Sequence, residues 1–510
     1  MGQKVSRERR AAFLTPVETQ DQLQAKFAHY LVRRSREWDL EKQKMITTTF
    51  DEIFTKFSVK GQPQEYWNTA SLVEFISPTL PADLRYIITD AAPILHRMVS
   101  RLGSYPYQTR TTGTLTLDVL RSAVIIIMLP YHYDLSFNRT PDYEYKSVEQ
   151  YEKDLRLKTH RLLFQSLTES VPLPVADLPR NDCTDEDLIQ ALHALSVDNI
   201  RFWSSKRDSV TKAPPLPPAL ALPSSNSDDL TGIIPLGELR SLLRLLLLYQ
   251  FTREDLDPKC ESFKLQLEQV TDCVLKAFSQ SDDEKRGDGV TWDSFTRTLT
   301  THLPRIFDGL SNLFTRFLRA QEPQAEPKPK LSPKALGEPI ICQLATFKPT
   351  MPPLSWRLPS YTVLDQNTFN GCVTSRTRTA MVLVSGLRNT TNVTFGILLG
   401  ACSEEKPSGD EGYTCIFQLE PVHCVYFDKR RELSKVSFSS DGQNQISIKV
   451  DIITENSESV ELTIENGKGA FVRKNVFQTE EGNTPITQHA QEGASIEGSF
   501  SADDIKFLGF

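Results

Sequence analysis

Two proline-rich stretches divide the chain into parts that differ in hydrophobic pattern. The first lies at residues 206–226 and the second at residues 321–339. Proline fixes φ and removes a backbone donor, so this density of proline, mixed with lysine, alanine and serine, is typical of an extended linker. The sequence therefore predicts separate compact parts joined by linkers.

The pattern before the second stretch is helical, and the pattern after it is that of strands. Leu239, Leu242, Leu243, Leu246 and Leu247 recur at helical spacing. The later segments are short and rich in β-branched and aromatic residues, and Gly, Asn or Asp clusters separate them. These segments are 380–384, 393–399, 414–419, 423–427, 446–453 and 460–464. We expect an α+β protein, with helical lobes followed by a β-rich antiparallel sheet or sandwich.

The helical part contains an internal repeat. Residues 113–122 and 232–241 share an opening glycine, a leucine four residues later and a closing Leu-Arg-Ser. Residues 288–295 have the same frame, and residues 67–72 form a weaker copy. The pattern resembles the second half of an EF-hand, with a turn, one β-bridge residue and then a helix. The bridge residues would be Trp67, Leu115, Ile234 and Val290, which makes two EF-hand-like lobes.

The four copies lack the side chains that calcium requires. An EF-hand loop needs oxygen ligands at positions 1, 3 and 5 and a bidentate carboxylate at position 12. Position 12 is Ser71, Val119, Glu238 and Ser294 in the four copies. Only Glu238 keeps the acid, so we expect the lobes to serve packing and to hold no metal. One residual calcium site in the third copy stays open.

The first ten residues carry a lipidation pattern. Gly2 follows Met1, and a serine stands at position 6, as N-myristoylation requires. One myristoyl chain binds a bilayer weakly, so a second signal is needed. The basic residues Lys4, Arg7, Arg9 and Arg10 supply it, at about 1 kcal/mol each against an anionic leaflet. Residues 1–44 hold ten Lys/Arg against six Asp/Glu, a net charge of +4. We therefore expect the N-terminus to contact an anionic membrane surface.

The charge of the rest of the chain argues against direct nucleic-acid binding. The whole chain holds 58 Lys/Arg and 65 Asp/Glu, a formal charge of −7. Residues 401–510 hold ten Lys/Arg against nineteen Asp/Glu, a net charge of −9. A protein that grips nucleic acid presents a broad basic face instead.

No arrangement of residues predicts catalysis or a bound cofactor. The eight histidines form no HxxxH, HExxH or HxH pair, and no glycine-rich phosphate loop or GxSxG elbow is present. His423 and Cys424 are neighbours on a predicted strand, so their side chains point to opposite faces. The eight cysteines form no CxxC pair, which favours reduced cytosolic thiols. We expect a protein that is not an enzyme and has no cofactor.

Four segments of the last third resemble a TLDc domain. They are Trp356–Ser360, Thr394–Leu398, Cys415–Pro421 with Tyr426, and the closing Asp504–Phe507. Together with the Gly2 signal and the EF-hand-like lobes, they make the chain similar to the fungal restriction-of-telomere-capping protein five family, relatives of the animal myristoylated TLDc proteins. The departures are Asp365–Gly371, where the family has a tryptophan and a glycine-rich segment, and Lys506, where it has a glutamate.

This resemblance implies a division of the chain and a function. The division is a basic myristoylated arm at 1–20, lobe 1 at 21–205, a linker at 206–226, lobe 2 at 227–320, a linker at 321–339 and the TLDc domain at 340–510. The family implies a non-enzymatic adaptor that binds the vacuolar proton-pumping ATPase and regulates its assembly, within stress or oxidation resistance and with a genetic link to telomere capping. The location expected is cytoplasmic, with peripheral attachment to the vacuolar membrane.

The same resemblance offers two candidate partner-contact residues, Glu420 and Lys506. We expect the residues from about 337 to 510 to carry the partner contact. The alternative is a redox-protective domain that acts through cysteine chemistry.

Overall fold

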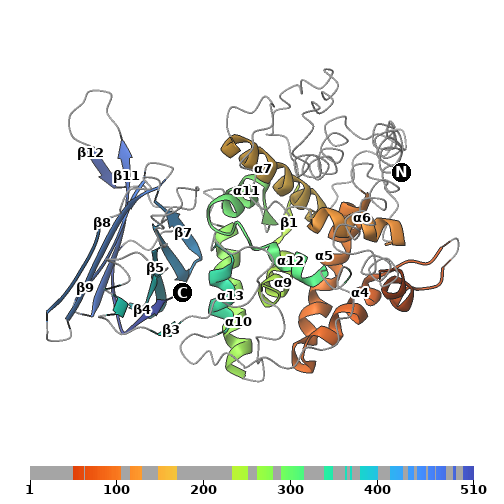
Figure 1. The fold of residues 1–510 in the computed structure, drawn as a ribbon, viewed down its shortest axis with the longest axis horizontal. Helices are drawn as coiled ribbons and strands as arrows, with labels where there is room; N and C mark the ends of the chain where they lie inside the picture. The colour runs from red at the N-terminus through yellow and green to blue at the C-terminus, as the bar shows by residue number, and fades with distance from the viewer. Residues whose placement is uncertain are drawn as a thin grey trace, which may run out of the picture. The chain divides into compact units, whose positions relative to one another are not determined.

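A computed structural model gives the fold of the chain, and the residues that it describes fall into two compact units (Figure 1). Unit 1 contains residues 1–242 and 310–326, and unit 2 contains residues 243–309 and 327–510. The structure describes residues 50–61, 64–104, 115–128, 148–168, 232–250, 261–279, 289–314, 317, 338–347, 362–363, 368–369, 371, 380–399, 414–428, 435–441, 445–454, 458–465, 467–477, 486–489 and 498–509.

Unit 1 is built of helices. Residues 50–57 are helical, and the further elements are α4 (Thr69–Ile76), the 3-10 turns η1 (Ser77–Thr79) and η2 (Ala82–Leu84), α5 (Arg85–Ser104), α6 (Leu117–Met128) and α7 (Val148–Leu167). Two more helices, α9 (Leu236–Leu248) and α12 (Asp308–Phe314), contain residues of both units.

The four repeat copies share one local structure. Trp67 and Leu115 form an antiparallel β-bridge, with both backbone hydrogen bonds made. The other two predicted bridge residues lie in the short strands β1 (Ile234–Pro235) and β2 (Gly289–Val290). In all four copies a helix begins two residues after the bridge residue, at Thr69, Leu117, Leu236 and Trp292. The bridge residue and the following helix are confirmed at each copy, while the preceding turn and the assignment to EF-hand lobes stay predictions.

The core of unit 1 includes a cluster of aromatic rings around Trp67. The ring centroid of Phe75 lies 5.3 Å from that of Trp67 and 4.7 Å from that of Phe317. The Trp67 indole N–H donates to the Phe54 carbonyl at 2.8 Å, so this fully buried ring leaves no polar atom unsatisfied. A bridge residue that carries the largest side chain thus ties the first repeat copy to the core.

The described residues of unit 2 contain three complete helices and two antiparallel sheets. The helices are α10 (Glu261–Phe278), α11 (Trp292–Thr301) and α13 (Glu338–Ala345). The first sheet has the order β3 (Thr362–Val363), β14 (Asp504–Gly509), β4 (Ala380–Arg388), β5 (Thr391–Leu399), β6 (Thr414–Glu420) and β7 (Cys424–Phe427). The second has the order β12 (Ile486–His489), β11 (Lys468–Phe477), β10 (Glu458–Glu465), β9 (Gln445–Ile453) and β8 (Lys435–Asp441), and β13 (Gly498–Ser501) also pairs with β11.

The two sheets of unit 2 pack face to face around an apolar core. Phe395 is fully buried there, with ring centroids 5.0 Å from both Phe471 and Phe500 of the second sheet. The other face of the first sheet packs against the helices of unit 2 (Figure 1). There the ring centroids of Phe417 and Phe347 lie 5.1 Å apart. Gly396 allows this contact, because a Cβ there would come within 2.1 Å of the Phe417 ring.

The predicted α+β fold with antiparallel sheets is confirmed. Each of the six predicted β segments coincides with a strand, and Phe395, Phe417, Leu419, Tyr426 and Phe507 are buried as a sheet core requires. The last strand, β14, lies inside the first sheet between β3 and β4.

The domain division stays a prediction. The linker at 206–226 and most of the linker at 321–339 lie outside the described residues. Unit 2 includes residues 243–309 as well as the predicted TLDc segment. A fragment that begins at residue 337 would therefore lack α10 and α11, which belong to the same compact unit as the sheets.

Candidate functional site

The predicted partner-contact residues Glu420 and Lys506 lie on one face of the first sheet, joined by a row of polar side chains. Lys506 Nζ lies 3.0 Å from Asp504 Oδ2, and Asp504 pairs in register with Ser385. Ser385 Oγ is 3.2 Å from Thr394 Oγ1, and Thr394 donates to Glu420 Oε2 at 2.8 Å. We call these five residues the polar row. Because the only proton of Thr394 Oγ1 goes to the carboxylate, the Ser385 hydroxyl donates to Thr394.

Strand alternation and one β-bulge place the polar row on a single face. Successive side chains of a strand point to opposite faces, and the neighbours Val384, Phe395 and Phe507 all lie in the core between the sheets. On β6 the register shifts by one residue, since Phe395 pairs with Gln418 whereas Thr394 pairs with Glu420. This shift brings Glu420 to the side of the sheet that Thr394 faces.

The polar row is partly exposed. The side chains of Lys506 and Asp504 are 36% and 54% exposed, so their ion pair is well solvated and adds little to stability. Thr394, by contrast, is 4% exposed and has its hydrogen bonds satisfied within the row. Leu387, two residues beyond Ser385 on β4, is 45% exposed. Charged, hydroxyl and apolar groups thus lie together, as at the edge of a protein–protein contact.

We call α10, α11 and α13 of unit 2 the helical layer. Beyond Glu420, polar groups of this layer hold the turn from β6 to β7. The backbone N–H of His423 donates to the Cys273 carbonyl of α10 at 3.1 Å. Gln343 of α13 donates to the Leu419 carbonyl at 2.9 Å, and its amide nitrogen lies 3.1 Å from His423 Nδ1. The helical layer therefore positions the end of the strand that carries Glu420.

The described cysteines are poor candidates for redox chemistry. Cys273, Cys342, Cys415 and Cys424 are buried thiols. Burial raises the pKa of the Cys273 thiol to about 12, with the Glu420 carboxylate adding to the effect, and burial also raises the pKa of Cys415. Since the thiolate is the reactive form, these thiols are held in their unreactive state. The cysteines at positions 183, 260, 372 and 402 lie outside the described residues.

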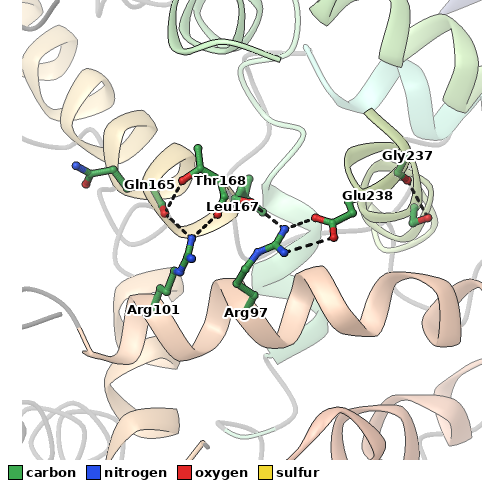
Figure 2. Close-up of polar contacts among 8 residues, drawn as sticks. Arg97, Arg101, Gln165, Leu167, Thr168, Gly237 and Glu238 are labelled. Carbon is green, nitrogen blue, oxygen red and sulfur yellow. Dashed lines mark hydrogen bonds and ion pairs between the residues drawn. The ribbon is translucent and has the colours of Figure 1, made fainter. Parts of the chain in front are cut away.

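Glu238, which keeps the acid of a calcium loop, makes an ion pair in unit 1 (Figure 2). Its carboxylate accepts from both terminal nitrogens of Arg97 on α5. Arg97 also donates to the Leu167 carbonyl at the end of α7 at 3.0 Å, and Arg101 donates to the carbonyls of Gln165 and Thr168. Two arginines thus cap the carboxyl end of α7, where positive charge is favourable. Calcium would have to displace Arg97 from Glu238.

The membrane-contact residues Gly2, Lys4, Arg7, Arg9 and Arg10 lie outside the described residues, so their role stays a prediction. In the part of the chain that is described, no helix is both long and apolar enough to cross a membrane. Within the same ranges, no group of three or more His, Cys, Asp or Glu side chains is arranged to hold a metal ion.

Several known fungal proteins similar to this chain share a name. Restriction of telomere capping protein 5 from Aspergillus flavus is 27% identical over 289 residues, which cover 52% of this chain and 42% of the relative. The protein of that name from Emericella nidulans is 27% identical over 297 residues, 53% of this chain and 41% of the relative. That from Colletotrichum graminicola is 22% identical over 471 residues, 78% and 72% of the two chains.

The similarity supports the relationship to fungal restriction-of-telomere-capping proteins that the sequence indicated. The matches to the Aspergillus flavus and Emericella nidulans proteins span less than half of each relative's own length. No protein-family model matches the chain, so the TLDc assignment stays a prediction, and no solved structure matches either.

Of the polar row, the sequence predicted Glu420 and Lys506 as partner-contact residues, but not the three residues between them. Ser385, Thr394 and Asp504 join Glu420 to Lys506 only through strand register, which local sequence does not contain. One signal was present for two of them, since Ser385 and Thr394 are polar residues that interrupt apolar β-runs. The buried contact between Gln343 and His423 joins residues 80 positions apart and had no signal in the sequence.

Proposed function

We propose that this protein is a non-enzymatic TLDc adaptor that binds the vacuolar proton-pumping ATPase and regulates its assembly. In this proposal, myristoylated Gly2 and the basic residues after it attach the protein to the cytoplasmic side of the vacuolar membrane. The effect on telomere capping, which the relatives' name records, and on stress or oxidation resistance would follow indirectly from the state of the pump.

The observation that supports the proposal most is the polar row. It places the two residues that the family resemblance offered, Glu420 and Lys506, on one partly exposed sheet face with Leu387 beside them. The similarity to the fungal proteins named Restriction of telomere capping protein 5 supports the family on which the partner assignment rests. The buried state of four cysteines favours an adaptor over the redox-protective alternative.

The test is affinity capture of the full chain from solubilised fungal vacuolar membranes, with the captured proteins identified by mass. We expect wild type to capture more ATPase subunits than the Lys506→Gln variant, which removes the ammonium group beside Asp504. The matched control is Lys449→Gln, because Lys449 makes a similarly exposed ion pair with Glu461 on the second sheet, at 2.7 Å. Equal capture of the ATPase by all three proteins would remove the polar row from the proposal, and a wild-type protein that captures no ATPase would remove the partner.

The redox-protective alternative makes a different prediction for the same protein. It requires peroxide-dependent oxidation of cysteine in the purified chain and loss of protection when all eight cysteines become serine. The adaptor proposal requires that the serine variant still captures the pump.

A further inference from the structure

Two histidines, His423 fully buried and His302 half-buried, join the β6–β7 turn to the helical layer of unit 2. His423 is fully buried, and its Nε2 lies 3.1 Å from the carbonyl oxygen of His302, the C-cap residue of α11. His302 Nδ1 lies 3.1 Å from the backbone nitrogen of Val425 in β7. The ring of His302 also meets the ring of Tyr426 edge to face, with centroids 6.4 Å apart. His423 of the turn thus bonds the backbone at the end of α11, and His302 bonds the backbone of β7. We call these two contacts the junction between the sheet and the helical layer.

The hydrogen-bond partners fix which nitrogen of each ring carries a proton. The Leu419 carbonyl can only accept, so the Gln343 atom that faces it is the amide nitrogen, whose second N–H points at His423 Nδ1. His423 Nδ1 therefore accepts, and its proton is on Nε2, which donates to the His302 carbonyl. Val425 N–H can only donate, so His302 Nδ1 also accepts. Both rings are neutral in the docked state.

From this geometry we propose that His302 and His423 form an acid-sensitive lock between the sheet and the helical layer of unit 2. A proton on His423 Nδ1 would face the N–H of Gln343, and a proton on His302 Nδ1 would face the N–H of Val425. Either event replaces a hydrogen bond by two opposed donors, in a buried site at His423 and in a part-buried one at His302. Acid therefore releases the β6–β7 turn from the helices. Glu420, which directly precedes the turn, is then no longer held in place. The lock does not depend on which partner the polar row binds.

The charged groups around the two rings do not favour protonation. Arg297 of α11 and Arg473 of β11 both act on His302 with positive charge. On α10, the Cys273 carbonyl accepts from the His423 backbone N–H. The charges that act on the Cys273 thiol are those of Glu420, Lys276 and Asp272. Burial is the largest effect, and it lowers the pKa of His302 to about 4 and that of His423 to about 3.

The sign of the pH dependence follows from these directions. Both folded pKa values are below the ordinary 6.5, so the opened junction binds more protons than the docked one. The stability of docking is complete above pH 6.5 and is lost as the pH falls from 6.5 toward 4. Between pH 7.5 and pH 5.5, each histidine raises the equilibrium constant for opening about tenfold, so the two together raise it about 100-fold.

The test is amide hydrogen exchange of the full chain at pH 7.5 and pH 5.5, with intrinsic exchange rates corrected and peptides from residues 414–428 followed. We expect the opening constant of these peptides to be about 100-fold larger at pH 5.5. His302→Asn keeps an acceptor oxygen near the place of Nδ1 and does not titrate, so its ratio should fall to about tenfold, as should that of His423→Asn. The double variant should show a ratio near one. Since each ratio compares one protein with itself, a uniform loss of stability cancels.

His96→Gln is the matched control, because His96 is a buried histidine of unit 1 that hydrogen-bonds the Trp67 carbonyl. It should keep the wild-type ratio in residues 414–428. A wild-type ratio below about threefold overturns the lock, whether or not the variants fold. A ratio of 100-fold that survives in the double variant also overturns it, since other groups must then titrate.

Discussion

Replacing Phe395 by alanine tests the packing on which the polar row rests. Phe395 is fully buried between Phe471 and Phe500, with both centroid distances at 5.0 Å. Removing a buried phenylalanine costs about 3–5 kcal/mol, a total that includes its ring contacts, and two ring pairs place Phe395 in the upper part of this range. We expect a loss of about 4–5 kcal/mol, a large part of the 5–15 kcal/mol that is typical of a folded domain.

The assay is thermal unfolding of the full chain followed by calorimetry. For a unit of roughly 250 residues, 1 kcal/mol moves Tm by about 2–4 °C, so the transition of unit 2 should fall by about 10 °C. Leu387→Ala is the control, because this leucine lies on the adjoining strand and is 45% exposed. Its transition should move by no more than about 2 °C. A shift below about 3 °C for Phe395→Ala, or equal shifts for the two variants, would refute a core built on the face opposite the polar row.

Three further outcomes are expected. Gly2→Ala should move the full chain from the membrane fraction to the supernatant in cell fractionation, and unchanged partition would count against the lipid anchor. Isothermal titration of the full chain with calcium should give no micromolar heat, because Glu238 is already bound by Arg97, and a measured heat that Glu238→Gln abolishes would restore the residual site. Cys273 and Cys415 should stay unlabelled by a thiol reagent at pH 8 until the protein is unfolded, since burial raises the pKa of both, and labelling of the native protein would contradict this.

The sequence predicted local structure well where hydrophobic period and turn chemistry agree. The bridge residues Trp67, Leu115, Ile234 and Val290 each precede a helix start by two positions, because a polar turn and an amphipathic run both point to the same boundary. The strands β8, β11, β12 and β13 were not predicted. In β11, charged and polar residues interrupt the apolar pattern, and pairing with β10 and β12 holds it in the sheet.

The arrangement of the site was less predictable than its strands. Lys506 and Glu420 are 86 residues apart in sequence, and register across β14, β4, β5 and β6 joins them. The acceptor role of His302 depends on one backbone N–H of β7, more than 100 residues away. Long-range register and buried polar pairing are tertiary properties, so a single sequence showed the residues without their contacts.

The most direct measurement of the central claim is the affinity of the purified full chain for the purified vacuolar proton-pumping ATPase in detergent. The variant is Glu420→Gln with Lys506→Gln, which keeps an acceptor for Thr394 and removes the charge at both ends of the polar row. We predict that wild type binds, that this double variant binds at least tenfold more weakly with an unchanged Tm, and that Lys449→Gln binds as wild type does. Wild type that fails to bind, or a double variant that binds with wild-type affinity, would contradict the account.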